Sequence, residues 1–384
     1  MLVETVETQF QQIATPDRPL KLQCGETWTD VRIAYETYGE LNEGKSNVVL
    51  LFHALSGSQH AAGFNPAVEG VGDCWTEECQ TGWWNEFVGP GKALNTDKFF
   101  VICANYLGGC YGSTGPGSIN PETGRPYGAR FPSVGVSDIV DSQMRLLDEL
   151  GIDALHAVVG ASVGGMLTLN LATRYPGRVK RVAPIASNSA VTLLQRLHNF
   201  EQAFAIEADP RFRGGDYDPA DPPTRGLAVA RMIGHKTYVS LEAMQERART
   251  VCIDKADNLE WYQLSSTLES YMLHQSQKFT QRFDANTYLR IIDAWQRFDL
   301  AREAGCSSIE EAFERCVGQR YHIFSIDSDV SFYPEEQGLV AEQLKAAGVE
   351  ATRITVHSEK GHDAFLLEPF LFEPYLRAFL ENGD

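Results

Sequence analysis

The sequence has no long hydrophobic run and no excess of basic residues. Its longest apolar stretches, 48–52 and 99–104, are far shorter than the roughly 20 residues of a membrane-spanning helix, so we expect no membrane segment. Lys and Arg total 33 against 51 Asp and Glu, which gives a formal net charge of −18. Nucleic-acid binding depends on clustered basic side chains, so this balance argues against a nucleic-acid partner. It leaves an anionic small ligand open, because net charge does not describe one pocket.

Cysteine is scattered, and no targeting segment is visible. Among the eight cysteines only Cys74 and Cys79 lie close together, and no pair of histidines completes a zinc-binding pattern around them. We therefore predict reduced thiols and no metal site. Residues 1–20 lack the basic segment and apolar run of a secretory signal. These features favour a cytoplasmic protein.

The chain does contain an alternation of strand and helix patterns. With 384 residues and 43% hydrophobic content, it is long enough for one large domain with an insertion, or for two domains. Continuous apolar runs predict buried strands, and apolar residues at helical spacing predict helices between them. The predicted strands span 31–39, 47–52, 99–104, 155–159, 179–186, 321–326 and 353–357, and the predicted helices 137–150, 164–175 and about 369–380. This rhythm predicts an α/β fold with a mostly parallel sheet and helices on both faces.

The alternation stops between the two halves of the predicted sheet. Residues 190–318 are rich in helix-forming and charged residues and show no convincing strand pattern. We therefore predict a core domain formed by residues 1–189 and 319–384, with residues 190–318 inserted as a helical lid domain.

A Gly-x-Ser-x-Gly pattern centred on Ser162 lies between a predicted strand and a predicted helix. This is the context of a nucleophile elbow, in which a sharp turn raises the serine hydroxyl above the sheet edge. Gly160 and Gly164 permit such a turn, and the backbone amide of Val163 would face a developing oxyanion. The alternative interpretation is a tight turn whose serine only caps the helix.

An elbow serine needs an orienting carboxylate and a histidine base, which follow it along the chain in that order. His362 lies in a glycine-marked loop after the last predicted strand, where a base can reach the serine. The other downstream histidines fall in the insertion or within strand patterns. Asp327 and Asp329 both follow the preceding strand pattern. Spacing alone leaves both open, with a preference for Asp329, which lies farther into the loop.

The second oxyanion donor is expected in the loop after an early buried strand. The backbone amide of Leu55 has this position. His53 precedes the elbow serine in the chain, so we interpret it as a structural hydrogen-bonding residue rather than as the base.

Longer strings of residues extend these local patterns. They are HALSG at 53–57, NYLGGCYGSTGP at 105–116, MIGHKTY at 232–238, RFDAN at 282–286 and GHDAFL at 361–366. Through these strings, and over nearly its whole length, the chain resembles the homoserine O-acyltransferases, methionine-pathway acetyltransferases of the α/β-hydrolase superfamily.

The resemblance implies an α/β-hydrolase fold with a helical lid insertion, and a role for each candidate residue. Ser162 is the implied nucleophile, Asp329 the triad aspartate and His362 the base. Leu55 and Val163 supply the implied oxyanion-hole amides. Similar enzymes work by ping-pong chemistry, in which acetyl-CoA acylates the serine and the hydroxyl of homoserine then attacks the acyl-enzyme.

The resemblance also implies substrate contacts and partners. Asp363 corresponds to the residue that receives the acceptor's ammonium group, and Tyr238 belongs to the same expected site. No cofactor is implied, because acetyl-CoA is a substrate, and a homodimer through the helical insertion is implied. One position departs from the family pattern: Ala203 stands where an arginine usually binds the acceptor carboxylate. Because a buried carboxylate needs a cationic partner, Arg196, two turns earlier, is our candidate substitute.

Several functions share this set of residues. Acetyl transfer from acetyl-CoA to homoserine is the first hypothesis. The alternatives are serine or another alcohol as the acceptor, succinyl-CoA as the donor, and water as the acceptor, which would make the protein an esterase. The match across the insertion and the glycine-rich loops favours a transferase, because these segments would enclose a water-excluding site. The intact Ser162, Asp329 and His362 argue against a non-catalytic binding module.

Overall fold

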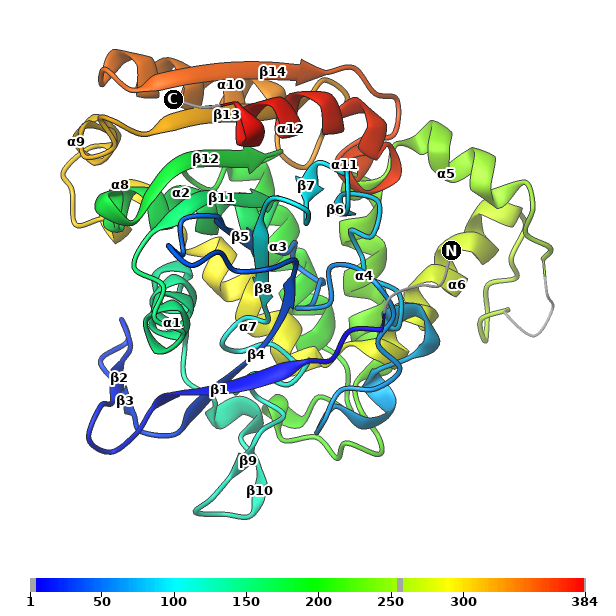
Figure 1. Ribbon diagram of the computed structural model, residues 1–384. Helices are drawn as coiled ribbons and strands as arrows, with labels where there is room; N and C mark the ends of the chain where they lie inside the picture. The colour runs from blue at the N-terminus through cyan, green and yellow to red at the C-terminus, as the bar shows by residue number, and fades with distance from the viewer. Residues whose placement is uncertain (1–4, 254–257, 383–384) are drawn as a thin grey trace.

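The computed structural model describes residues 5–253 and 258–382 and contains a central sheet of eight strands (Figure 1). The strand order is β1-β4-β8-β5-β11-β12-β13-β14. β1 and β4 are antiparallel, as are β4 and β8, and the six strands from β8 to β14 are parallel. Their bounds are β1 Gln9–Ala14, β4 Val31–Tyr38, β8 Phe100–Ala104, β5 Val48–Phe52, β11 Leu155–Ala161, β12 Val179–Ile185, β13 Arg320–Ile326 and β14 Glu350–Val356. The predicted mostly parallel sheet is confirmed.

The burial of each strand follows its place in the sheet. All five residues of β5, near the middle, are buried, which accounts for its continuous apolar sequence. β14 forms an edge, and most of its residues are at least partly exposed. Three two-stranded ribbons lie outside the sheet: β2 (Leu20–Lys21) with β3 (Thr27–Trp28), β6 (Val88–Gly89) with β7 (Leu94–Asn95), and β9 (Ile119–Asn120) with β10 (Arg125–Pro126).

Helices and loops cover both faces of the sheet. α1 (Val136–Glu149), α2 (Val163–Arg174) and α10 (Pro334–Ala346) contribute to the apolar core on one face. α12 (Glu373–Glu381) and the loop at 84–94 form the core on the other face. The α/β arrangement that the alternating pattern predicts is therefore present.

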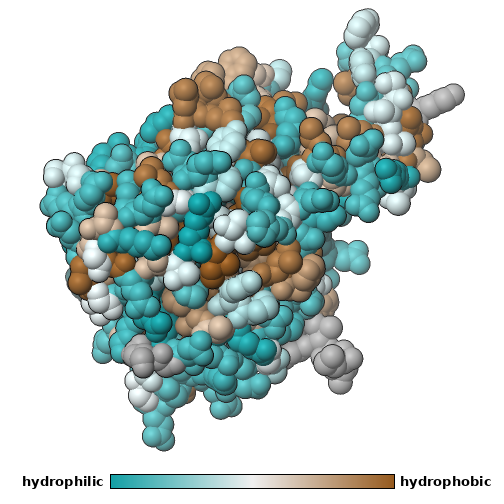
Figure 2. All heavy atoms as spheres, turned by 90° about the horizontal axis from the view of Figure 1, so that it is seen from above, coloured by the Kyte–Doolittle hydropathy of each residue, from teal (hydrophilic) through white to brown (hydrophobic). Residues whose placement is uncertain are grey.

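A helical segment separates β12 from β13. Among the described residues of 190–318, it holds α3 Leu193–Glu207, α4 Thr224–Tyr238, α5 Leu241–Ala248, α6 Thr267–Arg282, α7 Ala285–Gln296, α8 Leu300–Glu303 and α9 Ile309–Glu314, and no β-strand. α4 packs against both α3 and α6, and α5 packs against α6. The region of α5 and α6 extends away from the body of the molecule, at the right in Figures 1 and 2. No helix in the described part of the chain is long and apolar enough to cross a membrane.

The topology brings three candidate residues to one edge of the sheet. Ser162 follows β11, Asp329 follows β13 and His362 follows β14. These strands are parallel, so their carboxyl ends meet at the same edge, where ligands bind in α/β folds.

Candidate active site

Ser162 forms the sharp turn between β11 and α2. Its backbone has φ 59° and ψ −124°, a conformation that is strained for any residue other than glycine. The turn is tight enough to require its glycines: a Cβ at Gly160 would lie 2.3 Å from the carbonyl oxygen of Gly164. A Cβ at Gly164 would lie 2.5 Å from the carbonyl oxygen of Phe52 on β5. The strand, turn and helix expected of a nucleophile elbow are thus all present, and they hold Ser162 in a strained conformation.

His362 and Asp329 form a buried pair. The His362 Nδ1 lies 2.7 Å from the Asp329 Oδ2, and both side chains are almost fully buried. The other carboxylate oxygen, Oδ1, accepts hydrogen bonds of 2.8 Å from the backbone amides of Ser331 and Phe332. The aspartate is therefore fixed by its own loop. The opposite ring nitrogen of His362, Nε2, is buried and has no hydrogen-bond partner in the part of the chain that the structure describes.

The environment of His362 favours its protonated form. Burial alone would lower the pKa of this imidazole, but the charge and hydrogen bond of Asp329 outweigh it, and the pKa is raised above its ordinary value. Asp327, the other candidate carboxylate, pairs instead with the exposed His357 at 2.7 Å. The structure therefore brings Asp329, and not Asp327, to His362.

Two backbone amides are available near the elbow. Leu55 lies in a turn that is closed by a 3.0 Å hydrogen bond from the amide of Gly57 to the carbonyl of Ala54. The amides of Leu55 and Val163 donate no backbone hydrogen bond among the described residues. Gly164 contacts the strand end just before this turn, so the turn and the elbow adjoin.

A carboxylate, Asp363, follows His362 in the chain, and the charge of an arginine on α4, Arg231, acts on it. The amide of Asp363 donates a 2.8 Å hydrogen bond to the carbonyl of Tyr238, whose ring centre is 6.1 Å from that of His362. The guanidinium carbon of Arg231 lies 5.6 Å from the centre of the Tyr238 ring. Burial raises the pKa of Asp363, and the positive charges of His362, Arg231 and Arg247 oppose that shift. Sequence reasoning missed Arg231, whose Nε is buried without a hydrogen-bond partner among the described residues.

Comparison with known proteins identifies the family of the chain. Residues 47–369 match the model of the alpha/beta hydrolase fold family. A homoserine O-acetyltransferase of Solidesulfovibrio magneticus is 40% identical over 99% of this chain and 94% of its own length. The chain belongs to the homoserine O-acyltransferase family of α/β hydrolases.

Other relatives differ in the reaction that they are named for. A homoserine O-succinyltransferase of Stutzerimonas stutzeri is 42% identical, over 96% of this chain and 94% of its own length. The crystal structure of homoserine O-acetyltransferase from Bacillus anthracis is 27% identical with a TM-score of 0.86, and covers 99% of this chain and 98% of that one. A solved esterase is also 27% identical, with a TM-score of 0.85, over 98% of this chain and all of its own.

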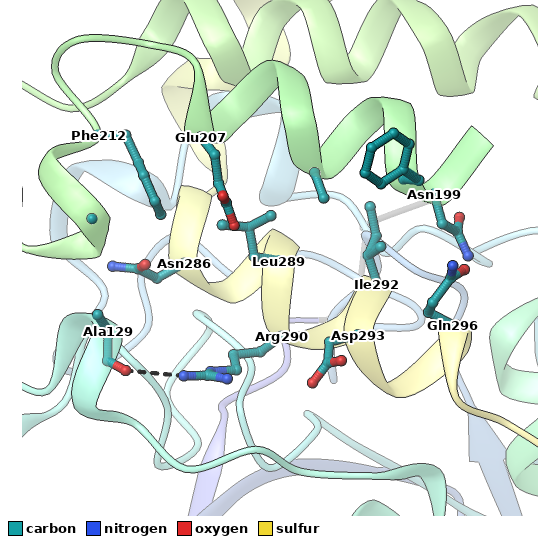
Figure 3. A pocket seen from close by; sticks show the side chains of 13 residues that line it. Ala129, Asn199, Glu207, Phe212, Asn286, Leu289, Arg290, Ile292, Asp293 and Gln296 are labelled. Carbon is teal, nitrogen blue, oxygen red and sulfur yellow. Dashed lines mark hydrogen bonds between the residues drawn. The ribbon is translucent and has the colours of Figure 1, made fainter. Parts of the chain in front are cut away.

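The position that departs from the expected pattern, Ala203, lines a pocket that contains none of the candidate catalytic residues. Ala203 lines a pocket of about 520 Å³ between α3 and α7, together with Glu207 and Leu289 (Figure 3). Arg196 is exposed and donates a 3.3 Å hydrogen bond to the carbonyl of Gln296. Both residues thus lie on the side of α3 that faces α7, whereas the arginines whose charges act on Asp363 are on α4 and α5.

Two further histidines, His53 and His235, are buried, and burial lowers the pKa of each. Burial lowers the pKa of His53 to about 4, and its Nδ1 lies 2.7 Å from the carbonyl oxygen of Ala54. Burial, together with nearby arginines, lowers the pKa of His235 to about 3. No group of three or more potential metal ligands occurs among residues 5–253 and 258–382.

Proposed function

We propose that this protein transfers an acetyl group from acetyl-CoA to the hydroxyl of L-homoserine through an acyl-enzyme on Ser162. One observation carries the choice of acceptor: Asp363, which follows the buried His362, is within the electrostatic reach of Arg231, whose Nε is buried without a hydrogen-bond partner among the described residues. A small amino acid carries the matching ammonium and carboxylate groups. The names of the relatives support the same acceptor.

In the first half-reaction, the Ser162 hydroxyl attacks the thioester carbonyl while His362 Nε2 takes its proton. Asp329 keeps the imidazole oriented and stabilises its positive charge. The amides of Leu55 and Val163 donate to the oxyanion of the tetrahedral intermediate. When the intermediate collapses, the C–S bond breaks and the proton passes to the departing thiolate of CoA. No resident cofactor takes part.

In the second half-reaction, homoserine replaces CoA. Its ammonium group pairs with Asp363 and its carboxylate with Arg231, near the buried ring of Tyr238. Its γ-hydroxyl then attacks the acetyl carbonyl and gives its proton to His362, and collapse of the second intermediate releases O-acetylhomoserine and the Ser162 hydroxyl. A carboxylate out of bulk water needs such a charge-assisted partner.

The donor and the acceptor are tested in one series of assays. Incubation with acetyl-CoA alone should add one acetyl group to Ser162, seen by intact-protein mass spectrometry and absent from Ser162→Ala. Thiol release should then be compared with homoserine and serine as acceptors, and with acetyl-CoA and succinyl-CoA as donors. A higher kcat/KM for serine, or for succinyl-CoA, would overturn that part of the proposal.

Hydrolysis is the competing function, because an esterase shares this fold at a TM-score of 0.85. The two functions differ in what happens to the acyl-enzyme. In a transferase the acyl-enzyme should persist until homoserine is added. In an esterase water should hydrolyse the acyl-enzyme equally fast with and without homoserine. The rate of CoA release with no acceptor present decides between them.

We propose that the helical segment at 190–318 acts as the lid of the site and as the contact of a homodimer. Helix α3 exposes a row of large apolar side chains, spaced three or four residues apart so that they share one face of the helix. Each of them is more than half exposed: Leu193, Leu197, Phe200 and Phe204. Analytical ultracentrifugation of the protein and of a Phe200→Glu/Phe204→Glu variant tests this contact: the variant should sediment as a monomer.

A further inference from the structure

The side chain of the last residue of helix α6 reaches the turn that carries one of the two proposed oxyanion donors. The last residue of α6, Arg282, places its Nη1 3.2 Å from the carbonyl oxygen of Ser56. Ser56 follows Leu55 directly. The Arg282 side chain is largely buried, so this hydrogen bond is shielded from water.

Other contacts hold the guanidinium in this position. Its Nη1 also lies 3.2 Å from the hydroxyl of Tyr111, and the same hydroxyl donates a 2.7 Å hydrogen bond to the carbonyl of Arg282. The guanidinium carbon lies 5.2 Å from the centre of the Phe279 ring. Glu78 lies 3.5 Å from the Nε as an ion pair, without hydrogen-bond geometry. The arginine is therefore anchored on several sides and directed at one carbonyl.

The turn itself is fixed at its beginning by the core domain. The Ala54 carbonyl accepts from the amide of Gly57 and contacts the Nδ1 of His53. At its end, no other hydrogen bond to the Ser56 carbonyl occurs in the described part of the chain. The Ser56–Gly57 peptide is thus held at its amide by the Ala54 carbonyl and at its carbonyl by Arg282, so Arg282 supplies the hold on this peptide that comes from outside the turn.

We propose that Arg282 is a positioning residue, which holds the Ala54–Gly57 turn so that the Leu55 amide faces the oxyanion. It acts from the lid and touches no substrate. Because the same amide serves both half-reactions, loss of Arg282 slows acylation and deacylation alike and leaves acceptor binding unchanged. The inference rests on the proposed oxyanion role of Leu55.

The test compares Arg282→Gln with Lys278→Gln. Lys278 lies one turn earlier on α6 and pairs with the same Glu78, at 3.2 Å, without contacting the turn. Arg282→Gln should lower kcat about 10- to 100-fold, less than the loss of a whole oxyanion donor, with the KM for homoserine within twofold. Lys278→Gln should retain the wild-type kcat. Equal kcat values for the two variants, or a rise in the homoserine KM as the only effect, would overturn the proposal.

Two further measurements separate positioning from stability and from the choice of substrate. Tyr111→Phe removes a partner of the guanidinium and keeps the arginine, so it should lower kcat in the same direction by a smaller factor even if Arg282→Gln does not fold. Acetyl transfer from p-nitrophenyl acetate to the enzyme also forms an oxyanion but needs neither CoA nor homoserine. If the wild type transfers no acetyl group to homoserine and Arg282→Gln still slows acetylation by p-nitrophenyl acetate, the acceptor assignment is wrong and the positioning role stands. If Arg282→Gln leaves the rate of this acetylation unchanged, the positioning role is rejected.

Discussion

The backbone of the lid is bonded directly to the loop that carries His362, which makes Gly361→Ala an informative substitution. The amide of Ser240 donates a 3.1 Å hydrogen bond to the carbonyl of Lys360, and the amide of Asp363 donates to Tyr238 at 2.8 Å. Gly361 lies between these bonds with φ +78°. An added Cβ would lie 2.9 Å from the backbone nitrogen of Ser240, closer than real Cβ atoms approach.

The chain offers a matched control in Gly348, which has φ +80° and no atom within 4 Å of an added Cβ. An alanine in the left-handed region costs about 1–2 kcal/mol, so both variants should lose this much stability. Gly361→Ala must also displace backbone that cannot move as a flexible side chain does. Weakening the two lid hydrogen bonds costs about 1 kcal/mol each, so its total loss should reach about 3–4 kcal/mol.

The catalytic effect should separate the two variants more clearly. A displacement of His362 by a fraction of an ångström should lower the kcat of Gly361→Ala about 10- to 100-fold, because misplacement by about 1 Å can cost about 100-fold. Gly348→Ala should keep the wild-type kcat. Urea unfolding gives the stabilities, and thiol release with saturating substrates gives kcat. If the two variants lose equal stability and Gly361→Ala keeps full activity, the lid does not position the histidine loop.

Three other changes have defined outcomes. Arg231→Gln should raise the homoserine KM at least tenfold without changing the rate at which acetyl-CoA alone acylates the enzyme. Arg196→Gln should change neither quantity. A raised homoserine KM in Arg196→Gln but not in Arg231→Gln would restore Arg196 as the carboxylate partner. Burial lowers the pKa of His362, but Asp329 outweighs burial, so this pKa lies above the ordinary histidine value of about 6.5. Because the base must be neutral, kcat/KM should fall as the pH is lowered, with a midpoint above that ordinary value. In Asp329→Asn that midpoint should move to lower pH and kcat should fall about 10⁴-fold, and an unshifted midpoint would argue against the assignment. Glu36→Gln should lower the free energy of unfolding by about 3 kcal/mol at pH 7, because it removes the charge of a buried carboxylate that accepts hydrogen bonds from the Tyr38 and Thr8 hydroxyls and lies 2.7 Å from the His60 ring. Burial raises the pKa of the Glu36 carboxyl, but its partner histidine and hydroxyl donors outweigh burial, so the pKa lies below its ordinary value. The stability of the wild type should therefore fall as the pH drops below the ordinary glutamate range. Urea unfolding at pH 4 should accordingly show a smaller difference between the wild type and Glu36→Gln than at pH 7.

The parts of the molecule that depend on local sequence could be predicted. The elbow at Ser162 is encoded within a few residues, since a buried strand, two glycines and a helix specify the turn. β11 and α2 begin and end within two residues of their predicted bounds. The parallel order of the later strands follows from their alternation with helices.

The parts that depend on how distant elements pack could not be predicted from one sequence. β1 pairs with β4 only through long-range contacts, and no strand was expected there. Arg196 and Arg231 lie on different helices, and the orientation of each helix decides which of the two charges acts on Asp363. A usable signal existed nonetheless: Arg231 and Tyr238 are seven residues apart, so they share one face of α4.

The position of the insertion also affects how the chain folds during synthesis. β12 and β13 are neighbours in the sheet, yet Arg181 pairs with Arg320, which lies 320 − 181 = 139 residues later. At a ribosomal rate of about 5–20 residues per second, β12 waits about 7 to 28 s for its partner. During that time β12, whose last four residues are apolar and buried in the finished sheet, presents an unpaired edge, the kind of surface that recruits chaperones and promotes aggregation. Production of this protein should therefore respond more to translation rate and chaperone supply than the stability of the finished sheet suggests.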